Sequence, residues 1–360
     1  TERICAAITE KTALAVLSSD AISSVAYATD QILFVLGGAI GVSAVQYVFP
    51  ISAVIVGLLV LVGISYQQTI HAYPGGGGSY TVAKENLGQR AGLIAAAALL
   101  TDYILTVAVS VSGGVAAITS AYPALVPHTV AIGLCAILLL MVVNLRGVRE
   151  SGIAFSIPTY AFIVMMLALI GFGLWKLLHG VAPVAVVAPL DVDKSTARHG
   201  AFPAGYALMF LLLRGFAEGC AAMTGTEAIS NGVQAFRAPT QHNAAITLSW
   251  MVAILATFFL GVSYMAHQYA VMPTTAQTVL SQLGHHIFGG GIAYYALQYS
   301  TFAILVLAAN TAFADFPRLA GILANDKFMP SQLAARGDRL AFSNGIISLA
   351  LVAMLLVWLF

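Results

Sequence analysis

The sequence predicts an all-α integral membrane protein with the inverted-repeat fold of a transporter. Of its 360 residues, 60% are hydrophobic and only 8% are charged, whereas an average soluble domain is about 25% charged. Apolar stretches of about 20 residues, the length that crosses a bilayer as a helix, recur along the whole chain. Two of them carry polar interruptions at matching places in the two halves, as substrate-binding helices of transporters do.

Hydropathy, together with Gly, Pro and charged residues as boundaries, predicts nine spans. They lie near residues 8–38, 45–70, 91–121, 127–144, 152–178, 203–236, 244–268, 292–324 and 341–360. The connectors on one side hold Arg3, Lys11, Lys84, Arg90, Arg146, Arg149, Arg237, Arg318, Lys327, Arg336 and Arg339, whereas those on the other side hold only Lys194 and Arg198. Because cytoplasmic loops carry the excess of positive charge, we expect the N-terminus in the cytoplasm.

The longest outer connector, near 180–202, separates five predicted spans from four. We therefore expect a first repeat over residues 1–180, with helices 1 to 5, and a second over residues 181–360, with helices 6 to 9. Because the first repeat has an odd number of spans, the second repeat begins on the opposite side of the membrane and is therefore inverted. The implied arrangement is five plus five, so the second repeat is expected to be incomplete at its C-terminus.

Each interrupted helix carries one carboxylate among small and hydroxylated residues. Helix 1 breaks at Ser18-Ser19-Asp20-Ala21-Ile22-Ser23-Ser24, and helix 6 breaks at Thr224-Gly225-Thr226-Glu227. On helix 3, Asp102, Thr106 and Ser110 recur at i, i+4 and i+8 and therefore share one face. An acid at a helix centre costs about 2.5 to 3.5 kcal/mol in a membrane, and Arg214 is the only clear basic candidate at that depth. The acids are expected to bind a cation or a proton.

These side chains would surround one central volume if helices 1, 3 and 6 meet. Asp20 and Tyr27, the helix 3 face with Tyr103 beside it, and Thr224 and Glu227 would then offer only oxygen. Oxygen ligands suit hard cations, and unwound backbone adds further carbonyls, which favours a small monovalent cation. The eight histidines show no metal-ligand spacing, so no transition metal is expected, and no cofactor is indicated.

Three simpler interpretations of these polar residues remain open beside the cation site. Ser18, Ser19 and Asp20 are good N-cap residues that could merely start a helix. The hydroxyl-bearing face of helix 3 could serve only to bond its neighbours. Glu227 could stay protonated as a hydrogen-bond donor, and the same property would let it carry a coupling proton.

Three further acids and one glycine-rich connector are expected to have structural roles. Asp30 and Asp315 are expected to be interface or cap residues, and Glu218 is expected to pair with Arg214 one turn away. The connector 71–80 contains four consecutive glycines, but neither a preceding strand nor a following Lys-Ser or Lys-Thr supports a phosphate cradle. A tight cytoplasmic re-entry or a hinge is the better prediction.

Five segments resemble the KimA-type potassium transporters of the amino acid-polyamine-organocation (APC) superfamily. They are SSDAISSVAYATDQIL, AYPGGGGSYTVAKENLG, LTDYILTVAVSVSGGVAAITSAYP, NLRGVRESG and GCAAMTGTEAISNGV. The resemblance covers almost the whole chain, and long motifs of this kind are specific.

The resemblance implies a LeuT-like fold and proton-coupled potassium uptake across the bacterial inner membrane, with no enzymatic activity. Carried over by position, the potassium-site residues are Asp20, Tyr27, Asp102, Tyr103, Thr106, Ser110, Thr224 and Glu227, with Glu227 and Asp20 as proton-coupling candidates. The family also has further spans, a tyrosine on helix 10 and a cytosolic C-terminal domain linked to dimer formation and cyclic di-AMP control, all beyond Phe360. The expected partners are potassium, the proton, lipid and a second copy through that domain, without nucleic acid.

A proton-coupled amino acid or polyamine permease is the competing prediction, because one fold hosts many substrates. Such permeases hold a substrate carboxylate with backbone N–H groups at a helix break. Here each break carries an acid that would repel a carboxylate, so a polyamine or a cationic amino acid fits better than a neutral amino acid. A channel or a sensor on the same scaffold is a third alternative, against which the two broken helices argue.

Overall fold

The computed structural model describes residues 10–73, 78–146, 152–180, 205–334 and 342–359, which are helical apart from turns and short connections. The predicted all-α class is confirmed for this part of the chain. The connector 181–204 and the glycines of 74–77 lie outside the described residues. The expected division into repeats and the expected re-entry at 71–80 therefore stay predictions.

The helices differ widely in length. The first half of the chain contains α1 (Glu10–Leu17), α2 (Ser19–Ser23), α3 (Val25–Ile40), α4 (Val45–Ala72), α5 (Ser79–Leu87), α6 (Gln89–Ala121), α7 (Thr129–Leu145) and α8 (Gly152–Leu178). The second half contains α9 (Tyr206–Gly219), α10 (Ala228–Asn231), α11 (Thr240–Gln268), α12 (Val279–Phe288), α13 (Ile292–Asn325) and α14 (Ser343–Leu359). The short helices α5 and α12 were not predicted, because each is too short to give a membrane-span signal.

Seven segments among the described residues are long and apolar enough to cross a membrane. Six of them match the predicted spans 91–121, 127–144, 152–178, 203–236, 244–268 and 292–324. The seventh, Val25–Ala72, joins most of the first two predicted spans, and the span at 341–360 corresponds to the 17-residue helix α14. The count of nine spans stays a prediction.

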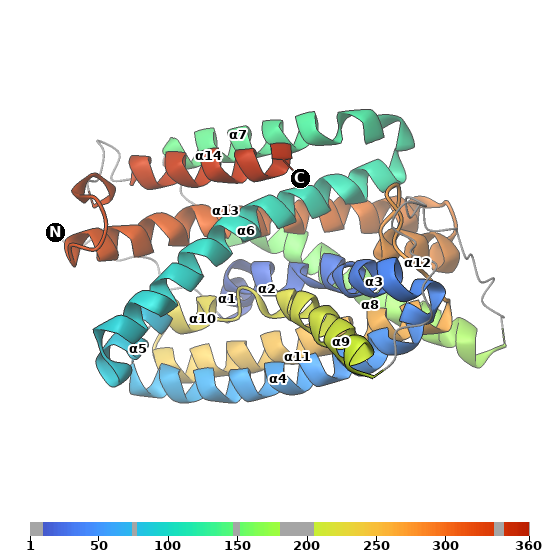
Figure 1. Ribbon diagram of the computed structural model, residues 1–360, viewed down its shortest axis with the longest axis horizontal. Coiled ribbons are helices and arrows are strands. Elements are labelled where there is room, and N and C mark those ends of the chain that lie inside the picture. Colours follow the sequence, from blue (N-terminus) through green and yellow to red (C-terminus); the bar gives the residue numbers. More distant parts are fainter. Residues whose placement is uncertain (1–9, 74–77, 147–151, 181–204, 335–341, 360) are drawn as a thin grey trace.

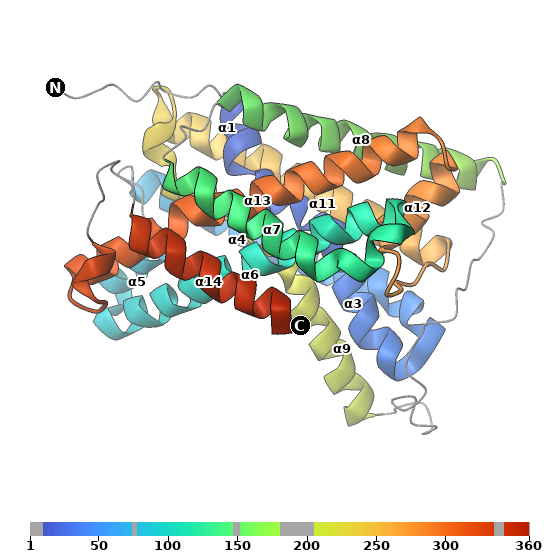
Figure 2. The same cartoon turned by 90° about the horizontal axis from the view of Figure 1, so that it is seen from above.

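Helices that are distant in sequence pack side by side (Figure 1). Helix α6 runs along α13, α4 runs along α11, and α14 packs against α7 at one edge of the molecule. The interrupted segment α1–α3 lies between α6 and α13 on one side and α4 and α11 on the other (Figure 1). It contacts α13, and Figure 2 shows α1 beside α8 and α3 beside α9. Neighbouring helices thus surround the broken backbone, which in a membrane must be kept away from lipid.

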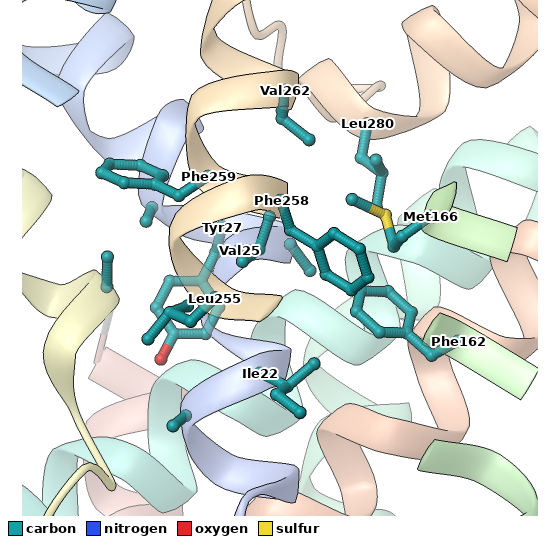
Figure 3. Close-up of a cluster of buried hydrophobic side chains, with 14 of the residues drawn as sticks. Ile22, Val25, Tyr27, Phe162, Met166, Leu255, Phe258, Phe259, Val262 and Leu280 are labelled. Carbon is teal, nitrogen blue, oxygen red and sulfur yellow. The ribbon is translucent and has the colours of Figure 1, made fainter. Parts of the chain in front are cut away.

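Two apolar clusters hold these helices together. The first joins α1–α4, α8 and α11, with Phe162, Phe258 and Phe259 fully buried in it, and the second joins α6, α7, α13 and α14. Tyr27 belongs to the first cluster, but its hydroxyl points away from the other labelled side chains (Figure 3). The ring is therefore anchored by packing while the hydroxyl stays available to polar neighbours.

Asp30 is confirmed as a cap residue, for a helix far away in the sequence. Its Oδ1 accepts the N–H of Val279, the first residue of α12, at 2.7 Å. At the other end of α12, Lys176 Nζ donates to the carbonyls of His286 (3.2 Å) and Ile287 (2.8 Å). A negative charge at the N-terminus and a positive charge at the C-terminus complement the helix dipole. Helix α12 consequently ties α3 to α8.

Candidate functional site

The break in helix 1 is a pair of kinks at Ser18 and Ser24 rather than an extended loop. Both residues are fully buried, and the short helix α2 between them carries Asp20. The predicted capping by the serines is wrong: Ser18 makes no side-chain cap bond, and Ser19 Oγ donates backwards to the carbonyl of Val16 at 3.2 Å. Hydroxyls that bond to preceding carbonyls loosen and bend a helix. Ser19 and Ser24, whose Oγ donates to the carbonyl of Ala21 at 2.6 Å, therefore favour the kinks, whereas the Ser18 hydroxyl has no partner among the described residues.

The break in helix 6 is longer. Helix α9 ends at Gly219, a short 3-10 turn covers Cys220–Met223, and Thr224 to Glu227 run as turns before α10. Gly225 has φ of +75°, a conformation that costs any residue with a Cβ about 1 to 2 kcal/mol. Glycine at this position allows the positive φ, and the turns at Thr224 to Glu227 interrupt the regular helix between α9 and α10.

The two breaks lie directly against each other. Ser24 Oγ is 2.8 Å from the carbonyl of Ala222, and Tyr27 Oη is 3.5 Å from Thr224 Oγ1. A Cβ on Gly225 would lie 2.6 Å from Asp20 Oδ2, so the backbone of helix 6 touches the carboxylate of helix 1. The other oxygen, Asp20 Oδ1, is buried without a hydrogen-bond partner in the described part of the chain.

Two cavities meet at this junction. The one near α5, termed the α5 cavity, has a volume of about 470 Å³ and is lined by Tyr66, Ser79, Ala95, Ala98, Leu99, Asp102, Cys220, Met223, Thr224, Gly225, Thr226 and Glu227. The one near α9, termed the α9 cavity, has a volume of about 410 Å³ and is lined by Tyr27, Gln31, Asp102, Leu105, Thr106, Val109, Glu218, Cys220, Ala221 and Thr224. Asp102, Cys220 and Thr224 line both cavities. They therefore form the boundary between them.

The polar face of α6 is only partly directed at the cavities. Asp102 is half-buried and lines both cavities, and Thr106, which is 4% exposed, lines the α9 cavity. Ser110 is fully buried and lines neither cavity. The hydroxyls of Thr106 and Ser110 have no hydrogen-bond partner among the described residues. The alternative reading, in which this face only bonds neighbouring helices, is therefore wrong for these two hydroxyls.

Glu227 is held from two other helices. Tyr103 Oη on α6 donates to its Oε1 at 2.7 Å, and Ser79 Oγ at the start of α5 donates to its Oε2 at 3.3 Å. Both bonds have the carboxylate as acceptor, as an ionised Glu227 requires. Tyr103 thus acts on the site through Glu227, since it does not itself line the α5 or the α9 cavity.

Helix α5 is fixed to the end of α13 by an ion pair. Asp326 Oδ2 accepts from Lys84 Nζ at 2.6 Å and from the hydroxyl of Tyr80. The Lys84 ammonium, followed by the Tyr80 hydroxyl, holds the pKa of the Asp326 carboxyl below its usual range. A carboxyl whose pKa is lowered by folding stabilises the fold above its ordinary pKa and loses this effect as the pH falls through the lowered value. At neutral pH, therefore, the pair adds a small stabilisation to α5, which packs mainly against α6 and carries Ser79 beside Glu227.

Two of the sequence-based readings of acids need correction. No ion pair joins Glu218 to Arg214 in the described structure; both side chains are exposed, and Glu218 lines the α9 cavity. Asp315 lies in the interior of α13 instead of at its end, where its Oδ1 is 3.7 Å from Arg318 Nη1. Asp315 is thus not a helix cap and lines neither of the two cavities, but it does lie between helices, because it lines a smaller cavity with Tyr80 and Tyr103.

Four residues of the site received no role of their own in the sequence-based prediction: Ser79, Gly225, Cys220 and Gln31. The positive φ of Gly225 had a visible signal, since glycine between two threonines in a membrane span marks a backbone need. Ser79 and Gln31 had none, because their roles depend on contacts with helices far away in the sequence. Cys220 gave no signal either, because a lone cysteine in an apolar run resembles a core residue, yet it lies half-buried at the boundary of both cavities.

Two comparisons with known proteins found chains that are similar to this one. A family model described as an amino acid permease matches residues 8–360. The chain is also 48% identical over 353 residues to the potassium transporter KimA of Bacillus subtilis (strain 168). The alignment covers 98% of this chain and 56% of that relative, so the chain spans little more than half of the relative's length.

Proposed function

The chain belongs to the amino acid permease family, and from that premise we propose that it imports potassium by proton symport with alternating access. As a multi-pass membrane protein with seven candidate spans among its described residues, it would lie in the bacterial inner membrane with its N-terminus in the cytoplasm. The similarity to a potassium transporter supports the substrate. A LeuT-like fold with inverted repeats at 1–180 and 181–360 belongs to the same proposal, as does a homodimer formed through a region beyond this chain.

The charge of the junction is the observation that carries the proposal. Asp102 faces both cavities, Glu227 faces the α5 cavity, and Asp20 touches Gly225, yet no Lys, Arg or His lines either cavity in the described structure. Acids at this depth are costly unless something compensates them. Potassium near Asp20, Tyr27, Asp102, Thr106 and Thr224 would supply the missing positive charge.

In the proposed cycle, potassium enters through the α9 cavity and leaves through the α5 cavity. Helices 1, 2, 6 and 7, which are α1–α3, α4, α9–α10 and α11, rock against the rest once the acids are neutralised. Asp20 and Glu227 are the candidates for carrying the proton. Ser110, which lines neither cavity, would need a rearrangement to contact the ion directly.

The family description favours a second candidate, an amino acid permease. Proteoliposomes containing the chain should take up potassium and rubidium when the proton gradient is directed inward, and should take up sodium and lysine far more slowly. Equal amounts of empty liposomes provide the background. Lysine uptake without potassium flux would overturn the proposal in favour of the permease.

The substitution Glu227→Gln should uncouple potassium flux from the proton gradient. Glutamine keeps a carbonyl oxygen that can accept from Tyr103, and its amide can donate to Ser79, but it cannot bind a proton in this pH range. Uptake should therefore continue at a rate that no longer changes with an imposed pH difference. Ser79→Ala is the matched control, because it removes one hydrogen bond and leaves the carboxyl, so its pH dependence should persist. A wild-type pH profile in Glu227→Gln would place the coupling proton on another residue.

A further inference from the structure

We propose that the α9 cavity contains a second cation site, an antechamber in which Glu218 of α9 and Gln31 of α3 hold a partly hydrated monovalent cation before it reaches Asp102. The inference rests on the proposed function and adds an entry step to it. Its basis is three oxygen-bearing side chains that line the α9 cavity and make no hydrogen bond or ion pair in the described structure: Gln31, Thr106 and Glu218.

Glu218 carries a charge that nothing in its described surroundings neutralises. It follows the apolar run of α9, one residue before the helix ends at Gly219, and it lines the α9 cavity. Arg214, one turn earlier, is the charged neighbour on the same helix, but the two side chains form no ion pair. A carboxylate in this position has no role in holding α9 against its neighbours.

Gln31 and Thr106 complete the oxygen lining from two other helices. Gln31 lies half-buried on α3, in the turn that follows Tyr27, and none of the hydrogen bonds that the described structure makes uses its side chain. Thr106 on α6 is 4% exposed, and its buried hydroxyl also lacks a partner. A buried hydroxyl without a hydrogen bond costs about 1 to 3 kcal/mol. A ligand with positive charge in this cavity would satisfy it.

The walls of the cavity strengthen the attraction. Leu105, Val109 and Ala221 are apolar, and Asp102 adds a second acid at the boundary with the α5 cavity. A cleft that carries charge of one sign between walls of low dielectric concentrates the field and raises the local concentration of counter-ions. A cation would bind first at Glu218 and then move to Asp102 at the boundary with the α5 cavity. Each step must be weak enough to let the ion leave.

The test is the concentration dependence of potassium uptake by the Glu218→Gln variant in proteoliposomes, measured with a rubidium tracer. At about 10 mM ionic strength, where the Debye length is about 30 Å, KM should rise about threefold or more while the maximal rate stays at the wild-type value. At about 150 mM, where the Debye length is about 8 Å, the difference should shrink. The unchanged maximal rate also shows that the variant is folded.

Two further variants separate a site from a general effect of charge. Glu85→Gln removes an exposed acid on α5 that lines neither cavity, and it should leave KM unchanged. Gln31→Leu removes a ligand without changing the charge, and it should raise KM at both ionic strengths. A wild-type KM for Glu218→Gln, or for Gln31→Leu, overturns the antechamber.

The outcome for the wild-type protein distinguishes this inference from the proposed function. If wild type transports potassium and the variants behave like it, only the antechamber fails. If wild type does not transport potassium, the proposed function fails. Binding of rubidium to detergent-solubilised protein then tests the antechamber separately, with weaker binding by Glu218→Gln supporting it and equal binding overturning it.

Discussion

The substitution Asp102→Asn is expected to abolish potassium uptake while leaving a folded protein. Asp102 lines both cavities at their boundary, so an ion that crosses from one to the other passes its carboxylate. Removing one partner from a buried ion pair costs about 3 to 5 kcal/mol, and each 1.4 kcal/mol is about tenfold in affinity. Uptake at subsaturating potassium should therefore fall about 100-fold or more, measured as initial rates in proteoliposomes.

Folding of this variant should be preserved because Asp102 makes no hydrogen bond or ion pair in the described structure that asparagine would lose. The thermal melting temperature in detergent should equal or exceed that of wild type, since a neutral amide is cheaper to bury than a carboxylate. Asp102→Glu keeps the charge and should restore part of the uptake. Transport at the wild-type rate by Asp102→Asn would remove this residue from the ion path.

The helices could be predicted from the sequence because their signal is local. A run of apolar residues must be a helix in lipid, where every backbone group has to be satisfied within its own segment. The ends of α6, α8 and α13 accordingly fall within a few residues of their predicted positions. The acids also stood out, because a carboxylate such as Asp102 in an apolar run has no local explanation.

Contacts between helices could not be predicted in this way. The bond from Ser79 to Glu227 spans 148 residues, and the bond from Ser24 to Ala222 spans 198. The spacing of Arg214 and Glu218 suits an ion pair on an isolated helix, yet exposed pairs of this kind are worth only about 0.3 to 0.5 kcal/mol. So weak an attraction does not fix two long side chains, and Glu218 lines the α9 cavity instead.

The substitution Gly225→Ala should eliminate transport and destabilise the protein, although it adds a single methyl group. The new Cβ would lie 2.6 Å from Asp20 Oδ2 and 2.8 Å from Asp20 Cβ, and it would sit on backbone with φ of +75°. The conformation alone costs about 1 to 2 kcal/mol, and the overlap forces Asp20 or the helix 6 break to move. The measurements are the initial rate of potassium uptake and the melting temperature in detergent.

Substitutions of two other glycines separate the effect of backbone strain from the effect of steric overlap. Gly41 has φ of +59°, and Gly57 lies within α4; at both positions an added Cβ would meet no described atom within 4 Å. Gly41→Ala should therefore lower the melting temperature through the strain of its positive φ alone. Gly57→Ala should leave the melting temperature unchanged or raise it slightly, because alanine favours helices. Both should retain transport. Only Gly225→Ala combines backbone strain with overlap at a carboxylate, so its loss of transport should exceed what its melting temperature explains. If Gly225→Ala behaved like Gly41→Ala in both measurements, the contact between the two breaks would not be needed for transport.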